Sequence, residues 1–87
     1  MITIWKYPLT ITDDQIVTMP EKSQILSVGL QNDAICLWAL VNTNNDPTER
    51  HIYMFETGQP LEYISLLQFA GTLILHNIVL HVYSHPE

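Results

Sequence analysis

The stretch that most constrains the fold is residues 24–41, which read QILSVGLQNDAICLWALV. Two apolar runs meet at Asn32-Asp33, and both residue types tolerate the positive φ angles that a two-residue hairpin turn requires. A helix would have to carry Asn32-Asp33 in its middle, which makes that alternative weaker. We therefore predict a β-hairpin that forms the floor of the hydrophobic core.

The predicted turn sets the register of the hairpin, and the register sorts the side chains by face. One face carries three apolar cross-strand pairs, which are Leu30 with Ile35, Val28 with Leu37, and Leu26 with Ala39. The other face pairs Gly29 with Cys36, Ser27 with Trp38, and Ile25 with Leu40. A slip of one residue would expose the apolar set. Burial of about 1.5–3 kcal/mol for each large side chain therefore holds the register.

The other strands are expected where β-branched and aromatic residues recur between turn-forming residues. They are Ile2–Leu9, Gln15–Met19, His51–Phe55, Leu61–Phe69 and Thr72–Tyr83. The polar segment Asn42–Arg50 is expected to be a surface loop. The pattern predicts an all-β, mainly antiparallel fold: a small β-sandwich or half-open barrel of about six to seven strands with little or no helix.

The last two predicted strands would join near Ala70-Gly71. The final strand would then be longer than its partner and would leave Leu80–Ser84 as an unpaired apolar edge. Exposed strand edges invite pairing with another chain, so a homodimer through the C-terminal strand is expected.

Composition indicates one folded domain, residues 1–87, because the chain has 87 residues of which 47% are hydrophobic. The longest apolar run is too short to cross a membrane, and the opening MITIWKYPL lacks the pattern of a signal peptide. The single cysteine, Cys36, can form no internal disulfide. These features predict a cytoplasmic protein.

The charge balance argues against direct binding of nucleic acid. The net charge is −6, and the three cations Lys6, Lys22 and Arg50 are too dispersed to form a positive track for phosphates. The nine acids are scattered and are typical of a solvated surface. Mimicry of nucleic acid toward a basic partner remains an alternative.

Residues that could carry chemistry do not form a recognisable motif. The four histidines lack the spacing of a structural zinc site, and the three glycines are too far apart for a phosphate loop. We therefore expect no catalytic, cofactor-binding or metal-binding residues and no cofactor. A candidate binding surface is expected instead, because Tyr and Trp are enriched in binding hot spots. Its residues are Trp5, Lys6, Tyr7, Asp13, Asp14, Tyr63, His76, His81 and Tyr83.

Several short motifs carry a family resemblance. In the first half they are IWKYPL at Ile4–Leu9, ITDxQ at Ile11–Gln15, Met19-Pro20, ILSV at Ile25–Val28 and LWALV at Leu37–Val41. In the second half they are Thr57-Gly58-x-Pro60, Tyr63-Ile64, Gln68, Gly71-Thr72-Leu73 and His76. The chain resembles a family of short proteins of unknown function that are encoded largely by phages, prophages and bacterial genomes. Relatives usually end a few residues after His76, so residues 77–87 are expected to be a C-terminal strand extension.

The resemblance implies a phage or prophage origin and no enzymatic activity. We expect a non-enzymatic binding protein that blocks a host protein, as an anti-defence or regulatory inhibitor in the host cell cytoplasm. The alternatives are a protein that sequesters a nucleotide-like messenger and a virion or assembly component. No membrane partner is expected.

Overall fold

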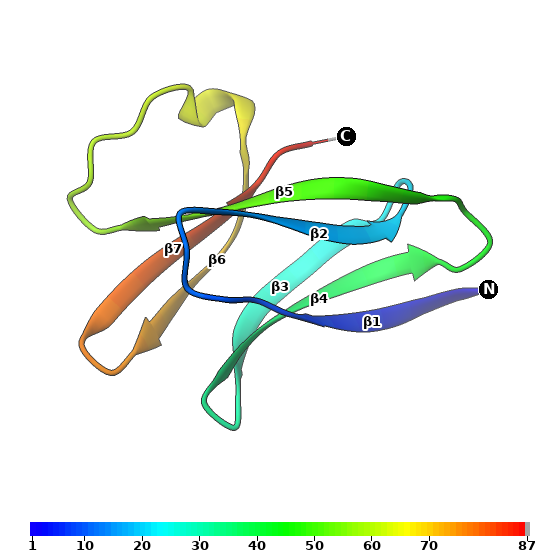
Figure 1. Cartoon of the computed structure of the whole chain (residues 1–87), viewed down its shortest axis with the longest axis horizontal. Helices are drawn as coiled ribbons and strands as arrows, with labels where there is room; N and C mark the ends of the chain where they lie inside the picture. The colour runs from blue at the N-terminus through cyan, green and yellow to red at the C-terminus, as the bar shows by residue number, and fades with distance from the viewer. Residues whose placement is uncertain (87) are drawn as a thin grey trace.

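The chain forms two β-sheets that pack face to face, in a computed structural model that describes residues 1–86 (Figure 1). The strands are β1 (Ile2–Pro8), β2 (Asp14–Pro20), β3 (Gln24–Gln31), β4 (Ala34–Asn42), β5 (Pro47–Glu56), β6 (Gln68–Leu75) and β7 (Ile78–Ser84). The first sheet has the order β1-β4-β3 and the second the order β2-β5-β7-β6, with every pair antiparallel. The predicted sandwich-like all-β class is confirmed.

The central hairpin is confirmed around its turn. Asn32 and Asp33 have φ angles of 51° and 64°, and the pairing from Gln31 with Ala34 back to Ser27 with Trp38 follows the predicted register. Beyond Ser27 the prediction is wrong by one residue. Leu26 is the extra residue of a β-bulge, so Ile25 pairs with Ala39.

The core lies between the sheets and contains the inward-facing residues of both. They are Leu9, Val17, Met19, Ile35, Leu37, Ala39, Val41, Ile52, Met54, Leu73, Leu80 and Val82. Strands β5 and β7 show the alternation of buried and more exposed residues that is typical of a sheet with one core face. Ile52 and Met54 point inward, and Tyr53 and Phe55 point away from the core.

The segment Asn42–Arg50 is mostly strand, so its prediction as a surface loop is wrong. Strand β4 continues to Asn42 and β5 begins at Pro47, which leaves only residues 43–46 between them. Arg50 points into the protein, where its Nη2 atom donates a hydrogen bond of 3.0 Å to the carbonyl oxygen of Ser23. The polar composition did not indicate this part of β5, because its buried residue, Arg50, is charged and donates to a backbone carbonyl.

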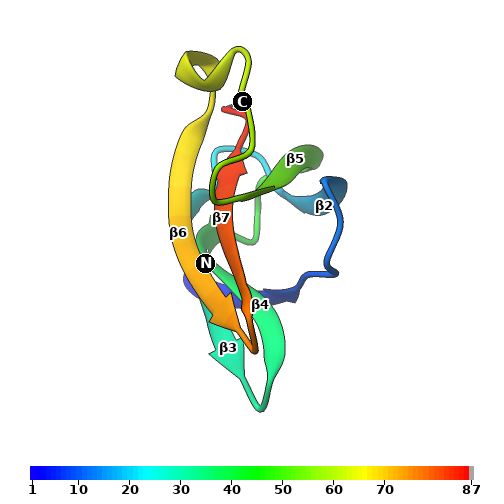
Figure 2. The same cartoon turned by 90° about the vertical axis from the view of Figure 1, so that its left-hand side faces the viewer.

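The two sheets approach each other closely at β3 and β6, which lie side by side (Figure 2). A Cβ atom added to Gly71 would lie 2.7 Å from Cγ2 of Val28, and Gly71 has a φ angle of 154°. The neighbouring residue Ala70 is the extra residue of a second bulge, where the pairing of β6 with β7 shifts between Phe69 and Gly71. A glycine is therefore required at this corner.

The predicted join of the last two strands at Ala70-Gly71 is wrong. Ala70 and Gly71 lie within β6, and the turn between β6 and β7 is His76-Asn77, where His76 has a φ angle of 55°. Strand β7 is paired with β5 on one side and with β6 on the other. The unpaired edge expected at Leu80–Ser84 is thus absent. Within the expected extension 77–87, β7 is an interior strand, and Glu87 lies outside the described residues.

Tyr7 packs against the core with its hydroxyl oxygen buried, and this atom has no hydrogen-bond partner within residues 1–86. Burial raises the pKa of the Tyr7 phenol above its usual value of 10.0. Ionisation of Tyr7 therefore does not affect the free energy of unfolding below pH 10.0. It lowers the free energy of unfolding as the pH rises from there through the higher pKa of the folded state.

We expect Tyr7→Phe to raise the free energy of unfolding by up to about 1 kcal/mol, because it removes a desolvated hydroxyl. It should also flatten the loss of stability at alkaline pH. Urea denaturation near neutral pH and above pH 10.0 measures both effects, with the exposed Tyr63→Phe as control. A loss of stability at neutral pH would contradict the prediction.

Candidate binding surface

The connection between β5 and β6 has to cross over β7. Both strands run antiparallel to β7, so they are parallel to each other, and parallel strands need a long return connection. Residues 57–67, which we call the crossover, make this return and form an open arc beside the sheet in Figure 1. The prediction of Leu61–Phe69 as a strand is wrong, because most of its apolar residues belong to the crossover.

Local hydrogen bonds shape the crossover. The backbone N–H of Gln59 donates a hydrogen bond of 3.1 Å to the carbonyl oxygen of Glu56, and Gly58 has a φ angle of 87°. Tyr63 has left-handed backbone angles and precedes a single 3-10 turn, Ile64–Leu66. Leu67 then returns to extended backbone and leads into β6.

His81 joins the start of the crossover to the sheet. Its Nε2 atom lies 2.8 Å from Oγ1 of Thr57, and its Nδ1 atom lies 3.0 Å from Oγ1 of Thr72 on β6. In a neutral imidazole one nitrogen donates and the other accepts, and a threonine hydroxyl can do either. His81 therefore has a positioning role between two hydroxyl groups.

Aromatic rings cover the outer side of the four-stranded sheet. We call this cluster the aromatic face, and it comprises His51, Tyr53, Phe55, Phe69 and Tyr83. Neighbouring ring centroids lie 5.3–6.4 Å apart, within the range of favourable aromatic contacts. The rings come from three strands, and β7 supplies Tyr83 directly opposite both Tyr53 and Phe69.

An open groove of about 400 Å³ separates the aromatic face from the crossover. Its lining residues are Tyr53, Phe55, Glu62, Tyr63, Leu66, Leu67 and His85. Tyr63 is 76% exposed and Leu66 is 59% exposed, so both present large side chains to solvent at the groove. The groove thus presents aromatic and aliphatic surface with one carboxylate.

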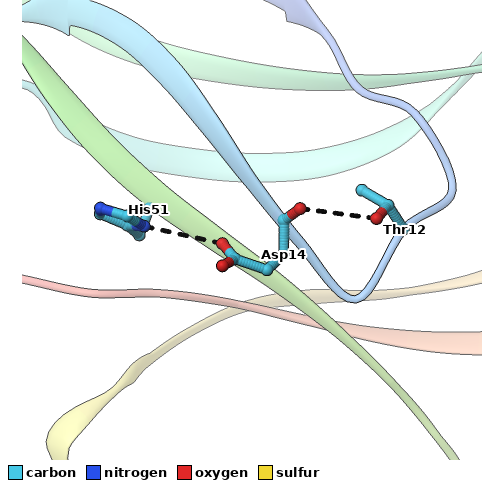
Figure 3. A network of polar contacts seen from close by, with 3 residues as sticks. All are labelled: Thr12, Asp14 and His51. Carbon is cyan, nitrogen blue, oxygen red and sulfur yellow. Dashed lines mark hydrogen bonds and ion pairs between the residues drawn. The ribbon is translucent and has the colours of Figure 1, made fainter.

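Asp14 and His51 lie together at the edge of the same sheet, where β2 pairs with β5 (Figure 3). His51 Nδ1 is 3.6 Å from Oδ1 of Asp14, and the carbonyl oxygen of Asp14 accepts a hydrogen bond from the Thr12 hydroxyl at 3.5 Å. Both side chains are about half exposed, so the pair contributes little to stability. The pair places the carboxylate of Asp14 next to His51, at one end of the aromatic face.

A second, polar cavity of about 390 Å³ lies where β5 begins and β7 ends. It is lined by Glu21, Lys22, Thr48, Glu49, Arg50, His51, His85 and Pro86. Two cations that are far apart in the sequence, Lys22 and Arg50, therefore meet at one cavity together with two carboxylates. Across residues 1–86 no group of three or more His, Cys, Asp or Glu side chains is arranged to hold a metal ion.

The predicted surface residues do not form one site. Asp14, His81 and Tyr83 lie on the outer side of the four-stranded sheet and Tyr63 lies on the crossover, so these four come near the groove. The others lie elsewhere. Trp5 and Tyr7 are on the inward side of β1, Lys6 is on the outer side of the first sheet, Asp13 precedes β2, and His76 is in the β6–β7 turn.

Lys6 has a structural partner on the first sheet. Its Nζ atom donates a hydrogen bond of 2.8 Å to Oε1 of Gln31. Lys6 lies on β1 and Gln31 on β3, with β4 between them, so the bond spans β4 beside Cys36. This arrangement explains why the Cys36 thiol is buried although it faces outward.

Sequence reasoning missed most of the groove. Tyr53 and Phe55 carried a usable signal, since the inward positions of Ile52 and Met54 required both rings to face outward. Glu62, Leu66 and Leu67 carried none, because an apolar run of this length is equally consistent with a strand. His85 reaches the groove only because β7 is an interior strand.

The fold and the groove define a sandwich-like all-β protein with an aromatic face on one outer side. Within residues 1–86 the structure contains no helix of the length and apolar character that a membrane span requires. The chain belongs to the family defined by a domain of unknown function, DUF7352, whose model matches residues 1–87. Searches of curated proteins and of solved structures returned no significant match. The family match does not address a phage origin, which stays a prediction.

Proposed function

We propose that this protein is a non-enzymatic binding module that recognises another protein through the groove and the aromatic face. The observation that supports this function best is the exposure of large apolar side chains around one concave site. Tyr63 and Leu66 line the groove and are 76% and 59% exposed, and Phe69 on the aromatic face is 61% exposed. Contiguous apolar surface of this kind is typical of interaction sites, and exposed tyrosines are frequent hot-spot residues.

The partner in this proposal is a host protein, and the chain acts as an inhibitor of phage or prophage type that blocks it. A small module without chemistry of its own can inhibit by covering a surface that its partner needs. The negative net charge of −6 supports association with a basic surface, because complementary charge accelerates encounter.

Capture from a bacterial lysate tests the proposal when wild type is compared with a groove variant. In Tyr63→Ala/Leu66→Ala both replaced side chains are exposed, so the fold should be retained. We expect this variant to lose a partner that wild type captures, with an affinity loss of at least about thirtyfold.

The matched control is Ile2→Ala/Ile4→Ala, which removes exposed apolar side chains from β1 of the other sheet, away from both the groove and the aromatic face. This control should capture the partner as wild type does. Capture that survives in the groove variant, or that is lost equally in the control, would contradict the proposal.

A second candidate function is the sequestration of a small anionic molecule, such as a nucleotide-like messenger, in the polar cavity. It is favoured by the meeting of Lys22, Arg50 and two histidines at that cavity. Glu21 and Glu49 line the same cavity and would repel phosphate, so protein binding is supported better. A thermal-shift titration with cyclic and linear nucleotides separates the two, since only the second function predicts stabilisation.

A further inference from the structure

We infer that the groove receives an arginine side chain of the partner, carried on an otherwise apolar segment. This inference rests on the proposed function and names the chemistry of the partner at the same site. It follows from the aromatic walls of the groove, its single carboxylate and its size.

Three aromatic rings face the groove. Tyr53 and Phe55 project from the same side of β5 with nearly parallel rings, at an interplanar angle of 6° and a centroid distance of 6.4 Å. Tyr63 comes from the crossover and is 76% exposed. The faces of such rings attract a cation that lies within about 6 Å of the centroid.

The charge of the groove is negative. Glu62 is the one carboxylate among its described lining residues, and neither lysine nor arginine lines it. The three cationic side chains of the protein lie elsewhere: Lys6 bonds to Gln31 on the first sheet, and Lys22 and Arg50 line the polar cavity. A cation from a partner therefore meets one carboxylate without a competing internal cation in the lining.

Arginine fits this combination better than an apolar group. Its planar guanidinium can stack on an aromatic ring while its N–H groups reach a carboxylate, which an aliphatic side chain cannot do. An apolar guest would partly desolvate Glu62 without giving it a partner, which is costly. The groove, of about 400 Å³, has room for one long side chain. Leu66 and Leu67 offer apolar contacts to the residues that flank the arginine in the partner segment.

The test is an NMR titration of the ¹⁵N-labelled full chain with two peptides, Ac-Leu-Arg-Leu-NH₂ and the same peptide with citrulline in place of arginine. Citrulline has nearly the same shape but no charge. We expect the arginine peptide to shift the amide signals of β5 and the crossover, and to bind about fivefold more tightly than the citrulline peptide. Glu62→Gln should reduce that difference, and the part that the aromatic rings contribute should remain.

The matched control is Glu56→Gln, which removes the same charge from an exposed glutamate outside the groove. This variant should keep the preference for arginine. Equal affinity for the two peptides, a preference that Glu62→Gln does not reduce, or signals that shift away from the groove would each overturn the inference. So would self-association that Tyr63→Ala abolishes, because a second copy would then occupy the groove.

The capture experiment is independent of this titration. If the groove variant loses a captured partner while the two peptides bind equally, the proposed function is supported and the inference that the groove receives an arginine is wrong. If the control variant loses the partner as well, the proposed function fails whatever the peptides show.

Discussion

Replacing Leu37 by alanine is expected to lower the free energy of unfolding by about 3–4 kcal/mol. Leu37 is 0% exposed and lies at the centre of β4, where both neighbouring strands hold the backbone in place. The surrounding side chains can therefore collapse only partly into the cavity, which is the condition for a large loss. A domain of this size has a total stability of about 4–13 kcal/mol, so the variant should unfold at a much lower denaturant concentration.

The control for this prediction is Leu26→Ala, which removes the same atoms from the same hairpin. Leu26 is the bulged residue and is 43% exposed, so its loss should cost less than about 1 kcal/mol. Urea denaturation measures both variants. Similar losses for the two leucines would show that Leu26 is buried with Ala39, as the simple register predicts, and that the bulge is absent.

Gly71→Ala is expected to destabilise the fold by about 3 kcal/mol, because the new methyl group meets Val28 across the corner between the sheets. The added Cβ would lie 2.7 Å from Cγ2 of Val28, and the φ angle of 154° is unfavourable for alanine. Crowding and backbone strain of this kind cost about 1–3 kcal/mol each. Thermal or urea denaturation measures the loss.

Two comparisons separate the causes. Gly58→Ala adds a methyl group at a φ angle of 87° with no atom within 4 Å, so it should show the backbone cost alone, about 1 kcal/mol. In a Val28→Ala background the crowding is relieved, so Gly71→Ala should cost about 1–2 kcal/mol less than in wild type. Additive losses for Val28→Ala and Gly71→Ala would contradict the proposed contact.

The predictions from sequence were correct where the local structure depends on residues that are close together in the chain. Asn32-Asp33 defined a turn, and the alternation on either side of it defined the cross-strand register as far as Ser27. It did not decide burial, because Leu30 on the predicted core face is 39% exposed and Cys36 on the other face is buried. Turn chemistry and two-residue periodicity act over a few residues, so they can be read without knowledge of the partner strands.

The errors arose where two structures share one local pattern. The apolar run at Leu61–Phe69 is compatible with a strand or with a crossover that packs on a sheet. Gly71 could end a strand as a turn or sit within one beside a bulge. In each case the structure was decided by β7, which lies between β5 and β6. Because β7 is paired on both sides, the predicted turn and the unpaired edge are both absent.

Residue order alone was thus enough to indicate an all-β chain, its central hairpin and the two faces of that hairpin. The sequence did not predict the groove. Tyr53, Glu62 and His85 meet only because β7 lies between β5 and β6 and the crossover passes over it. The physical reason is range. Backbone propensity and periodicity act between residues that are close in the sequence. The contacts of His81 with Thr57 and Thr72, and of Gly71 with Val28, join segments that only the folded sheets bring together.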